Sequence, residues 1–572
     1  MPDATPATKP IGRRIWNAGR TVLGLGTVAI VPVVAGEVGT QALASLYLAN
    51  VLPWLLPWLL LLAWSRRPLF ASLATTLLQL GLYALNGLKL AHLGIPILPA
   101  DLSVLGNIWN APDLFLRYLH GHSAYWGVVL LPILAWLERP LDGLRGRPRT
   151  ALALLAIASS LSLCLRLPPW PTGYGRQQLS IEVWLPAKGA REAGVVAQFL
   201  QLHLTTQQSV RKVDARALAA AEQWLQGQTP LPGSDAERPD IIVIQSESFF
   251  DPGDLVGIET ATFAPRLAAL RQHHAHGRLS VPAYGGLTTR SEFEFLTGFP
   301  LRGEPALEFP YQALVNRPMP ALPRALQAHG LGTTAIHPFA RTFYQRDVAL
   351  PFLGFEEFID EHAFSASDRD GHHVSDAALN RQIRSALALP GRRFVFAISI
   401  QNHGPWDTPH PLGEVALPPL PAGLSLDERG TLALRQYLHH FARGDQALGE
   451  LADWVMQRPE PTLLLFYGDH LPAMHYVIEH LPWKDGRAAY QQTTPWLLVD
   501  NRRKAARERI DLAASELAGL LLHRAGIDDA EPFARIERLR HARESGAIAA
   551  ERVEAWQRAL ATASITGAPT RP

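Results

Sequence analysis

The chain has 572 residues, and its 53 Lys and Arg against 51 Asp and Glu leave a formal net charge of +2. This near-balance excludes a broadly basic nucleic-acid-binding protein and an acidic disordered chain, so we expect no nucleic-acid partner. The single cysteine, Cys164, excludes an intramolecular disulfide and a CxxC metal or redox site. Any metal site must therefore be built from His and carboxylate ligands.

Five apolar stretches precede Arg166 and predict helices that cross a lipid bilayer, since a crossing needs about 20 apolar residues. They are residues 21–36, 41–64, 69–88, 125–137 and 150–165. The fourth is short, which leaves open a buried or tilted helix. A cleaved signal peptide does not fit the first stretch, because further apolar stretches follow it directly. We expect a multi-pass transmembrane domain at residues 1–166.

The arginines around these stretches predict their orientation. They cluster before the first stretch, between the second and third, and between the fourth and fifth: Arg13, Arg14, Arg20, Arg66, Arg67, Arg139, Arg145, Arg147 and Arg149. By the positive-inside rule these segments face the cytoplasm, and five crossings then place everything after Arg166 outside. The outer connection at residues 94–123 is itself apolar, and it either lies in the membrane plane or packs on the helices.

Residues 167–239 are predicted to form a juxtamembrane helical connector. Prolines at its start end the last crossing, because proline cannot continue a helix. Amphipathic patterns at residues 194–204 and 214–226 predict two helices, the second capped by Asp214. A stretch rich in Pro and Gly up to residue 240 then marks a domain boundary.

An α/β domain is predicted at residues 240–500. Apolar runs at residues 240–245, 394–400 and 462–467 predict buried parallel strands. Helical patterns lie between them at residues 265–272, 319–329 and 431–457. Such a sandwich binds its ligands at the C-terminal ends of the strands. A C-terminal helical region, 501–572, is predicted from helical spacing at residues 502–509, 512–525 and 533–543, and we assign it no chemistry.

Polar residues follow each predicted strand: Glu247 the first, His403 the second, and Asp469 with His470 the third. Taken singly, each is an ordinary turn or capping residue. Their recurrence at one sheet edge predicts a metal site, because packing alone gives no reason for it. Seven other histidines lie in polar contexts and are expected at the surface: His273, His274, His276, His372, His373, His439 and His440.

A fourth polar element is the turn at residues 284–293. Its Gly-Gly pair lets the backbone approach a ligand closely. The hydroxyls of Thr288 and Ser291 lie near an expected helix start, where free N–H groups favour a phosphate. An ordinary capped turn has the same pattern, so this turn gains its meaning from the residues around it.

The order Glu247, Thr288, His337, His403 and Asp469-His470 resembles the lipoteichoic acid synthase-like branch of the alkaline phosphatase and sulfatase superfamily. The matching motifs are residues 244–248, 286–293, 337–346, 402–405 and 468–470. The resemblance implies an α-helical membrane domain of about five transmembrane helices followed by an extracytoplasmic α/β sulfatase-like domain. It also implies the bacterial cytoplasmic (inner) membrane, with the catalytic domain on the periplasmic or extracellular side.

Members of that branch transfer phosphoglycerol from phosphatidylglycerol to an envelope glycan or glycolipid through a phospho-threonine intermediate. The resemblance makes Thr288 the nucleophile. It makes Glu247, Thr288, Asp469 and His470 the ligands of a divalent metal, with Mn²⁺ expected and Mg²⁺ or Zn²⁺ as alternatives. His337, Tyr344 and Arg346 are then expected to bind the substrate head group. His403 is expected to protonate the leaving oxygen or to hold a phosphate oxygen.

Two positions depart from the pattern of the polymer-forming relatives. Arg290 stands where they carry an acidic residue, and Tyr344 stands where they carry tryptophan. Arg290 either binds substrate phosphate or pairs with a carboxylate such as Glu292 or Glu294. Both departures bear on the acceptor and the product, and leave the chemistry possible.

Three alternatives stay open. A phosphoethanolamine transferase would share the fold and the threonine, but such enzymes normally carry periplasmic disulfides, and this chain has one cysteine. A sulfatase needs Cys or Ser as nucleophile with Pro two positions later, whereas Thr288 and Arg290 occupy those positions. A non-catalytic envelope-binding protein predicts an incomplete set of metal ligands, and the sequence has the full set.

Overall fold

The computed structural model describes residues 11–37, 44–93, 96–99, 101–104, 124–174, 190, 192–205, 213–228, 237–302, 304, 307–408, 416–421, 423–503 and 506–567. The chain divides into two compact units, residues 1–208 and 209–572. The predicted connector is divided between them, so its first helix belongs to the N-terminal unit and its second to the C-terminal unit.

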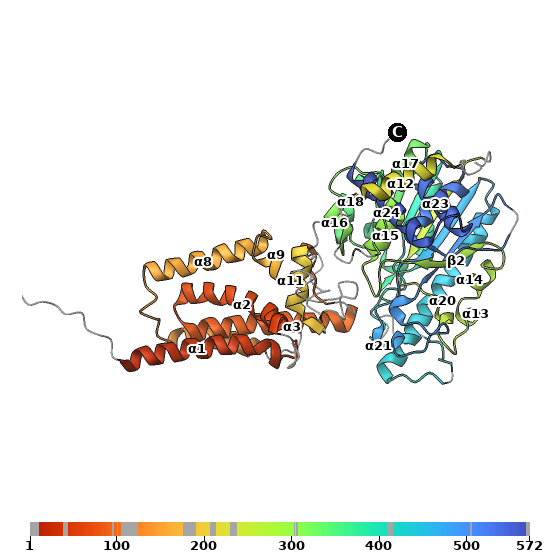
Figure 1. The fold of residues 1–572 in the computed structure, drawn as a ribbon. Helices are drawn as coiled ribbons and strands as arrows, with labels where there is room; N and C mark the ends of the chain where they lie inside the picture. The colour runs from red at the N-terminus through yellow and green to blue at the C-terminus, as the bar shows by residue number, and fades with distance from the viewer. Residues whose placement is uncertain are drawn as a thin grey trace, which may run out of the picture. The chain divides into compact units, whose positions relative to one another are not determined.

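The N-terminal unit is helical, and its long helices follow the five apolar stretches. They are α1 (Ile11–Val34), α2 (Ala44–Ser65), α3 (Pro68–Leu93), α7 (Ala124–Leu137) and α8 (Arg147–Cys164). Helices α1 and α2 pack on α3, and α8 packs on α2 (Figure 1). Short helices α4 (Asp101–Val104) and α9 (Trp170–Gly173) and the longer α11 (Val195–Thr205) complete the described part of the unit.

Three of these helices are long and apolar enough to cross a membrane: Ile15–Val34, Ala44–Ser65 and Pro68–Leu90. Helix α7 has 14 residues, which extend about 21 Å at 1.5 Å per residue, short of the roughly 30 Å hydrocarbon core. An N-terminal helical unit with three candidate membrane-spanning helices is therefore present, whereas anchoring in a membrane and the count of five crossings stay predictions. Most of the apolar connection at residues 94–123 lies outside the described residues.

The C-terminal unit is built on a nine-stranded sheet in the order β10-β2-β9-β8-β1-β7-β3-β4, with β11 pairing to β2. The central strands β8, β1, β7, β3 and β4 are parallel, and β9 runs antiparallel to both β8 and β2. The bounds are β1 (Asp240–Ser246), β2 (Ala275–Ser280), β3 (Gly332–Ile336), β4 (Glu357–Ile359), β7 (Arg393–Ile398), β8 (Thr462–Gly468), β9 (Thr494–Asp500), β10 (Glu508–Arg509) and β11 (Leu512–Ala513). The three predicted strands are confirmed as β1, β7 and β8.

Alternate residues of each central strand enter two different hydrophobic cores, as expected for a sheet covered on both faces. Ile241 and Val243 of β1 belong to the core shared with α15 (Thr288–Thr297), α17 (Leu322–Ala328), α18 (Arg346–Leu353), α22 (Ala514–Arg524) and α23 (Phe533–Glu544). Ile242 and Ile244 belong to the core shared with α14 (Pro265–Leu270), α19 (Asp376–Leu387) and α20 (Glu428–Gln457). The α/β sandwich expected from the sequence is therefore confirmed.

The ends of the C-terminal unit are packed together. Asp214 caps α12 (Ala215–Gln226) as predicted, accepting hydrogen bonds from the backbone N–H groups of Arg216 and Ala217. Helix α12 packs on α24 (Ala550–Thr566), with the Trp224 and Trp556 rings 6.2 Å apart (Figure 1). Helix α24 lies within the predicted C-terminal helical region, 501–572, although no separate helical pattern was predicted for its residues. The helix expected at residues 502–509 is wrong, because Glu508–Arg509 form strand β10 beside β2.

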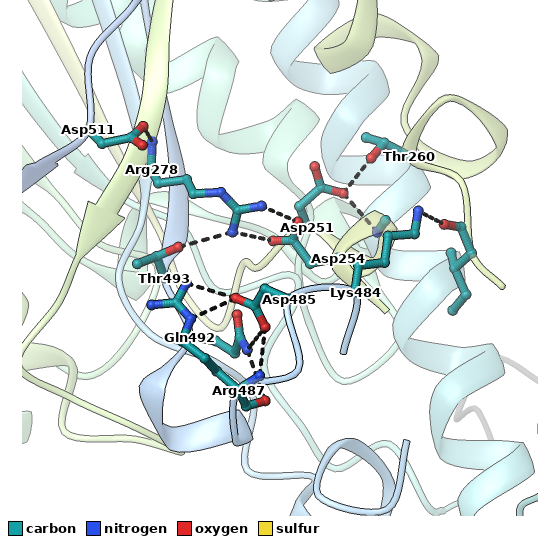
Figure 2. A network of polar contacts seen from close by, with 12 residues as sticks. Asp251, Asp254, Thr260, Arg278, Lys484, Asp485, Arg487, Gln492, Thr493 and Asp511 are labelled. Atoms are coloured by element: carbon teal, nitrogen blue, oxygen red, sulfur yellow. Dashed lines mark hydrogen bonds and ion pairs between the residues drawn. The ribbon is translucent and has the colours of Figure 1, made fainter. Parts of the chain in front are cut away.

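A polar network fastens the loop that follows β1 (Figure 2). Asp251 Oδ1 accepts hydrogen bonds from Gly253 N and Thr260 Oγ1, which closes a short 3₁₀ turn, Pro252–Asp254. Asp254 then accepts two hydrogen bonds from Arg278 of β2, at 2.6 and 3.2 Å. The loop that begins at Glu247 is thus tied to β2, which lies beyond β8 and β9 in the sheet.

Candidate active site

The predicted site residues lie at one edge of the sheet. Glu247 follows β1 directly, Asp469 and His470 follow β8, and His337 follows β3. His403 lies in the loop after β7. Because β8, β1, β7 and β3 are parallel neighbours, their C-terminal ends meet at the same edge.

Thr288 reaches this edge as the first residue of α15. The turn before it is tight: Gly286 has φ of 147° and Leu287 lies in the left-handed region with φ of 65°. A side chain at Gly286 would be strained in that conformation. Ser291 Oγ donates to the backbone oxygen of Asp469 at 2.6 Å, which ties the first turn of α15 to the end of β8.

The four predicted metal ligands and His403 are joined by short contacts. Thr288 Oγ1 lies 3.1 Å from Glu247 Oε1 and 3.3 Å from His470 Nε2. His470 Nε2 lies 3.3 Å from Asp469 Oδ2, and His403 Nε2 lies 3.5 Å from Glu247 Oε1. Residues as far apart in the chain as Glu247 and His470 therefore meet around the Thr288 hydroxyl.

Around the Thr288 hydroxyl, hydrogen-bond acceptor atoms of Asp469 and His470 lie close together, and they outnumber the donors available to them. His470 Nδ1 donates to the Leu471 carbonyl at 2.8 Å, so the neutral ring presents a lone pair at Nε2. Asp469 Oδ1 accepts from Ser248 N at 2.8 Å, while Oδ2 is buried and has no hydrogen-bond partner among the described residues. A buried carboxylate oxygen left in this way is costly, and a bound cation would satisfy it. The donor set of two carboxylates, an imidazole and a hydroxyl fits a divalent metal.

Burial also shifts the pKa values of Asp469 and His470. Burial, reinforced by the charge of Glu247, raises the pKa of Asp469 well above its ordinary value. Burial lowers the pKa of His470 to about 4, so its ring is neutral at physiological pH. A divalent cation would favour the ionised carboxylate and leave the neutral imidazole as a ligand.

His403 is about half exposed and lies at the open side of the cluster. Its Nδ1 donates to the Gly404 carbonyl at 2.8 Å, which leaves Nε2 facing Glu247. His373 Nε2 donates to the same carbonyl at 2.8 Å, and the His373 and His403 rings are 5.3 Å apart. Burial and the nearby His403 lower the pKa of His373 to about 3. His373 thus acts as a neutral brace for the loop that carries His403.

The predicted head-group residues form a second group beside the cluster. The Arg346 guanidinium pairs with Glu292 and lies 5.3 Å from the centre of the Tyr344 ring. Its Nη1 is buried and has no hydrogen-bond partner within the described part of the chain. His337 donates from Nδ1 to the Ile398 carbonyl at 3.1 Å. Burial and the charge of Arg346 lower the pKa of His337 well below its ordinary value.

Arg290 has a different environment from the one the sequence suggested. Its guanidinium donates to the backbone carbonyls of Pro282, Leu301, Glu304 and Leu307. These bonds hold the segment after α15 against the turn before it. The charge of Glu294, one of the two predicted carboxylates, also favours the charged form of Arg290. Contact of Arg290 with substrate phosphate stays a prediction.

Sequence reasoning missed Glu292, His373 and the burial of two histidines. Glu292 is one turn after Thr288, and that spacing on the predicted helix start was the available signal. His276 and His440 are buried, at 8% and 7% exposure, so the expectation of surface positions is wrong for them. Polar neighbours in the sequence do not reveal which side of a helix or strand faces a core.

The Sulfatase family model matches residues 239–527, just over half of the chain. The chain belongs to the sulfatase family. The superfamily resemblance drawn from the motifs is therefore confirmed, and the matched range extends beyond the predicted domain into α22. The matched range includes every strand-end residue described above.

Two curated relatives come from Rhizobium meliloti (strain 1021). A "Putative cyclic beta-1,2-glucan modification protein" is 32% identical over 264 residues, covering 46% of this chain and 40% of the relative. The capsular polysaccharide biosynthesis protein RkpI is 34% identical over 260 residues, covering 44% of this chain and 45% of the relative. This chain thus spans less than half the length of both relatives.

Among solved structures, one similar chain is the phosphoglycerol transferase GacH from Streptococcus pyogenes in complex with sn-glycerol-1-phosphate. Its sequence is 18% identical, the match covers 62% of this chain and 93% of that chain, and the TM-score is 0.47.

Proposed function

We propose that this protein is a membrane-anchored phosphoglycerol transferase, which moves glycerophosphate from phosphatidylglycerol to an envelope glycan or glycolipid. The observation that carries the proposal is the Thr288 hydroxyl among converging acceptor atoms of Glu247, Asp469 and His470. A threonine hydroxyl needs such an environment to act as a nucleophile, because it is a weak one at neutral pH.

In the proposed enzyme Glu247, Thr288, Asp469 and His470 hold a divalent cation, with Mn²⁺ favoured and Mg²⁺ or Zn²⁺ as alternatives. When bound, the cation stabilises the ionised threonine oxygen and neutralises charge on the phosphoryl oxygens. The buried, unpartnered Asp469 Oδ2 supports this assignment.

The first displacement uses Thr288 and two residues beside it. Thr288 Oγ1 gives up its proton to solvent and attacks phosphorus, with Glu247 Oε1 3.1 Å away. The Oγ1–P bond forms, and the bond from phosphorus to the diacylglycerol oxygen breaks. His403, protonated at Nε2 and open to solvent, gives that proton to the leaving oxygen. Diacylglycerol and a glycerophospho-threonine at residue 288 result.

The second displacement reverses these roles. An acceptor hydroxyl gives its proton to His403 Nε2 and attacks phosphorus, so the acceptor is phosphorylated by glycerol phosphate. The Oγ1–P bond breaks, and the threonine oxygen takes a proton back from solvent. Both residues return to their starting states, as a transfer cycle requires.

The donor head group is assigned to Arg346, His337 and Tyr344. The buried Nη1 of Arg346 makes no hydrogen bond within the described residues, while its other nitrogens are bound by Glu292. A guanidinium fixed in this way can grip a phosphate oxygen without losing side-chain freedom on binding. The neutral His337 ring has Nε2 available, since Nδ1 is committed to Ile398.

The acceptor is proposed to be a glycan of the cell envelope. This choice is supported by the names of the two curated relatives, one in β-1,2-glucan modification and one in capsular polysaccharide biosynthesis. A phosphoethanolamine donor remains the alternative, and the single cysteine disfavours it, because those enzymes normally carry disulfides.

The proposal is tested with the full chain in membranes that contain labelled phosphatidylglycerol and Mn²⁺. We expect release of diacylglycerol by the natural protein and loss of at least about 1,000-fold in rate in Thr288→Ala, since the nucleophile is gone. Thr289→Ala is the matched control, because its buried hydroxyl has no partner within the described residues. Full activity in Thr288→Ala contradicts the proposal, and consumption of labelled phosphatidylethanolamine instead supports the alternative donor.

A further inference from the structure

A second group of metal-ligating side chains lies outside the cluster around Thr288. Asp370, His439 and His440 each offer one ligand atom, and these atoms lie within 4.8 Å of one another. Asp370 ends the short strand β5 (Arg369–Asp370), and the two histidines are consecutive residues of α20. No residue of this group is among the predicted ligands of the first site.

The residue types suit a transition metal better than Mg²⁺ or Ca²⁺. Two imidazoles and a carboxylate are typical ligands of Zn²⁺, with water in the remaining position. Ligand atoms on one tetrahedral Zn²⁺ are about 3.4 Å apart for bonds of 2.0–2.1 Å. An ion would need these atoms to draw closer together. His440 is buried at 7% exposure, whereas the His439 and Asp370 side chains are only partly buried.

The Asp370 carboxylate accepts hydrogen bonds from two neighbouring side chains, Gln401 and Arg443. Its Oδ2 accepts from Gln401 Nε2 at 2.9 Å, an arrangement typical of the residues that orient a metal-bound carboxylate. Arg443 Nε also donates to Oδ2, at 3.2 Å, and its cation opposes metal binding. The Arg443 side chain is 51% exposed, and an exposed ion pair of this kind contributes little, so Arg443 can turn into solvent.

The group adjoins the loop that carries His403. Asp370 pairs across the hairpin of β5 and β6 (His373–Val374) with His373, whose ring donates to the Gly404 carbonyl. Gln401, which bonds Asp370, belongs to the same loop. A cation bound to Asp370 and α20 would therefore fasten the hairpin, the helix and the loop of residues 401–404 to one another.

We propose that Asp370, His439 and His440 form a second divalent-cation site of the Zn²⁺ class, separate from the site at Thr288. Its role is to brace the loop that carries His403. The proposal does not depend on the phosphoglycerol assignment, since it concerns residues that the transfer cycle does not use.

The test uses the full chain in detergent, stripped with a chelator and dialysed against Zn²⁺ alone, with bound zinc measured by mass spectrometry. We expect about two equivalents in the natural protein. Asp370→Asn, which keeps the hydrogen-bond acceptor for Gln401, should lose about one equivalent, as should the double variant His439→Gln/His440→Gln. Asp469→Asn should lose the other. His362→Gln is the control, because His362 pairs with Asp360 at the surface without a second imidazole.

The melting temperature is a second measurement, which separates zinc binding at this group from binding at the Thr288 site and from folding defects. In the Asp469→Asn protein, Zn²⁺ should raise the melting temperature, because only the folded chain presents the second site. The rise should vanish when Asp370→Asn is added. The proposal is overturned if Asp370→Asn binds as much zinc as the natural protein, or if Zn²⁺ stabilises Asp469→Asn and the combined variant equally.

Discussion

Glu292 shows how one buried residue can serve the whole reaction centre. It lies one turn after Thr288 on α15, accepts from the Tyr311 hydroxyl at 2.9 Å and pairs with Arg346. Both partners of the ion pair are essentially inaccessible to solvent, at 0% and 1% exposure. The nucleophile and the arginine proposed to bind phosphate are therefore positioned through a single helix turn.

Replacement of Glu292 tests this coupling. Glu292→Gln leaves the Arg346 charge buried without its counter-ion, which costs about 3–5 kcal/mol in stability for a pair of this kind. We also expect a higher KM for the lipid donor, because Arg346 loses its orientation. Thermal unfolding and donor titration measure the two effects. Glu450→Gln, an exposed residue bonded only to Gln446 among its described contacts, is the control; equal behaviour of the two variants would refute the coupling.

The sequence predicted the strand-end residues because parallel strands must bring their C-terminal ends together, whatever the loops do. Glu247, His403, Asp469 and His470 follow strands, and the structure brings them within 3.5 Å of one another or of Thr288. Arg290 could not be predicted in the same way. Its carbonyl partners lie at residues 282–307, and their positions depend on the course of a loop that no local pattern fixes.

Helix α23 offers a pH-dependent contribution to stability at the scale of one element. Burial disfavours the ionised form of Glu537, but hydrogen bonds and charge from Arg540 and His541 outweigh it and lower the pKa to about 2. The ordinary value is 4.5. A folded-state pKa below the unfolded one means stability that is fully present above about pH 4.5 and lost as the pH falls through about 2.

Glu537→Gln should therefore destabilise the C-terminal unit by about 3 kcal/mol near neutral pH, from a shift of about 2.5 units at 1.36 kcal/mol each. The deficit relative to the natural protein should shrink steadily below about pH 4.5. Thermal unfolding across this pH range measures it, with the exposed Glu551→Gln at the start of α24 as the control. A deficit that stays constant down to about pH 2 would show that the ion pair is not its source.

At the scale of helices and strands, the sequence predicted the long, apolar elements and did not predict the short or weakly apolar ones. Strands β1, β7 and β8 are long, buried on both faces and bounded by polar residues, so their patterns were clear. Strand β10 has two exposed residues, and only pairing with β2 makes it a strand. Helix α24 was missed because its alternation of small and charged residues gives a weak apolar face until α12 packs on it.

At the scale of the whole molecule, the number of membrane crossings distinguishes two possible topologies. Three helices are long and apolar enough to cross a membrane, whereas α7 and α8 do not meet both of these requirements. Three crossings and five crossings both place the C-terminal unit on the outer side if the N-terminus is cytoplasmic. They differ in the side of the connection between α7 and α8.

The single cysteine allows a direct test of this difference. In a Cys164→Ser background, Ser545→Cys at the exposed end of α23 should react with a membrane-impermeant maleimide in intact spheroplasts. Gly143→Cys, between α7 and α8, should be protected until the membrane is opened if five crossings are present; no atom lies within 4 Å of the added Cβ there. Labelling at both positions in intact spheroplasts would favour three crossings, and protection of Ser545→Cys would contradict an outer catalytic domain.

The pairing of α12 with α24 has a consequence for how the protein is made. The first helix of the C-terminal unit finds its hydrophobic partners in α23 and α24, the last two helices of the described chain, more than 300 residues later. The central strand β1 likewise waits for β7 and β8. Folding of this unit therefore cannot finish before α24 has been synthesised, and until then the nascent chain must be kept from aggregating with its first strand and Trp224 uncovered.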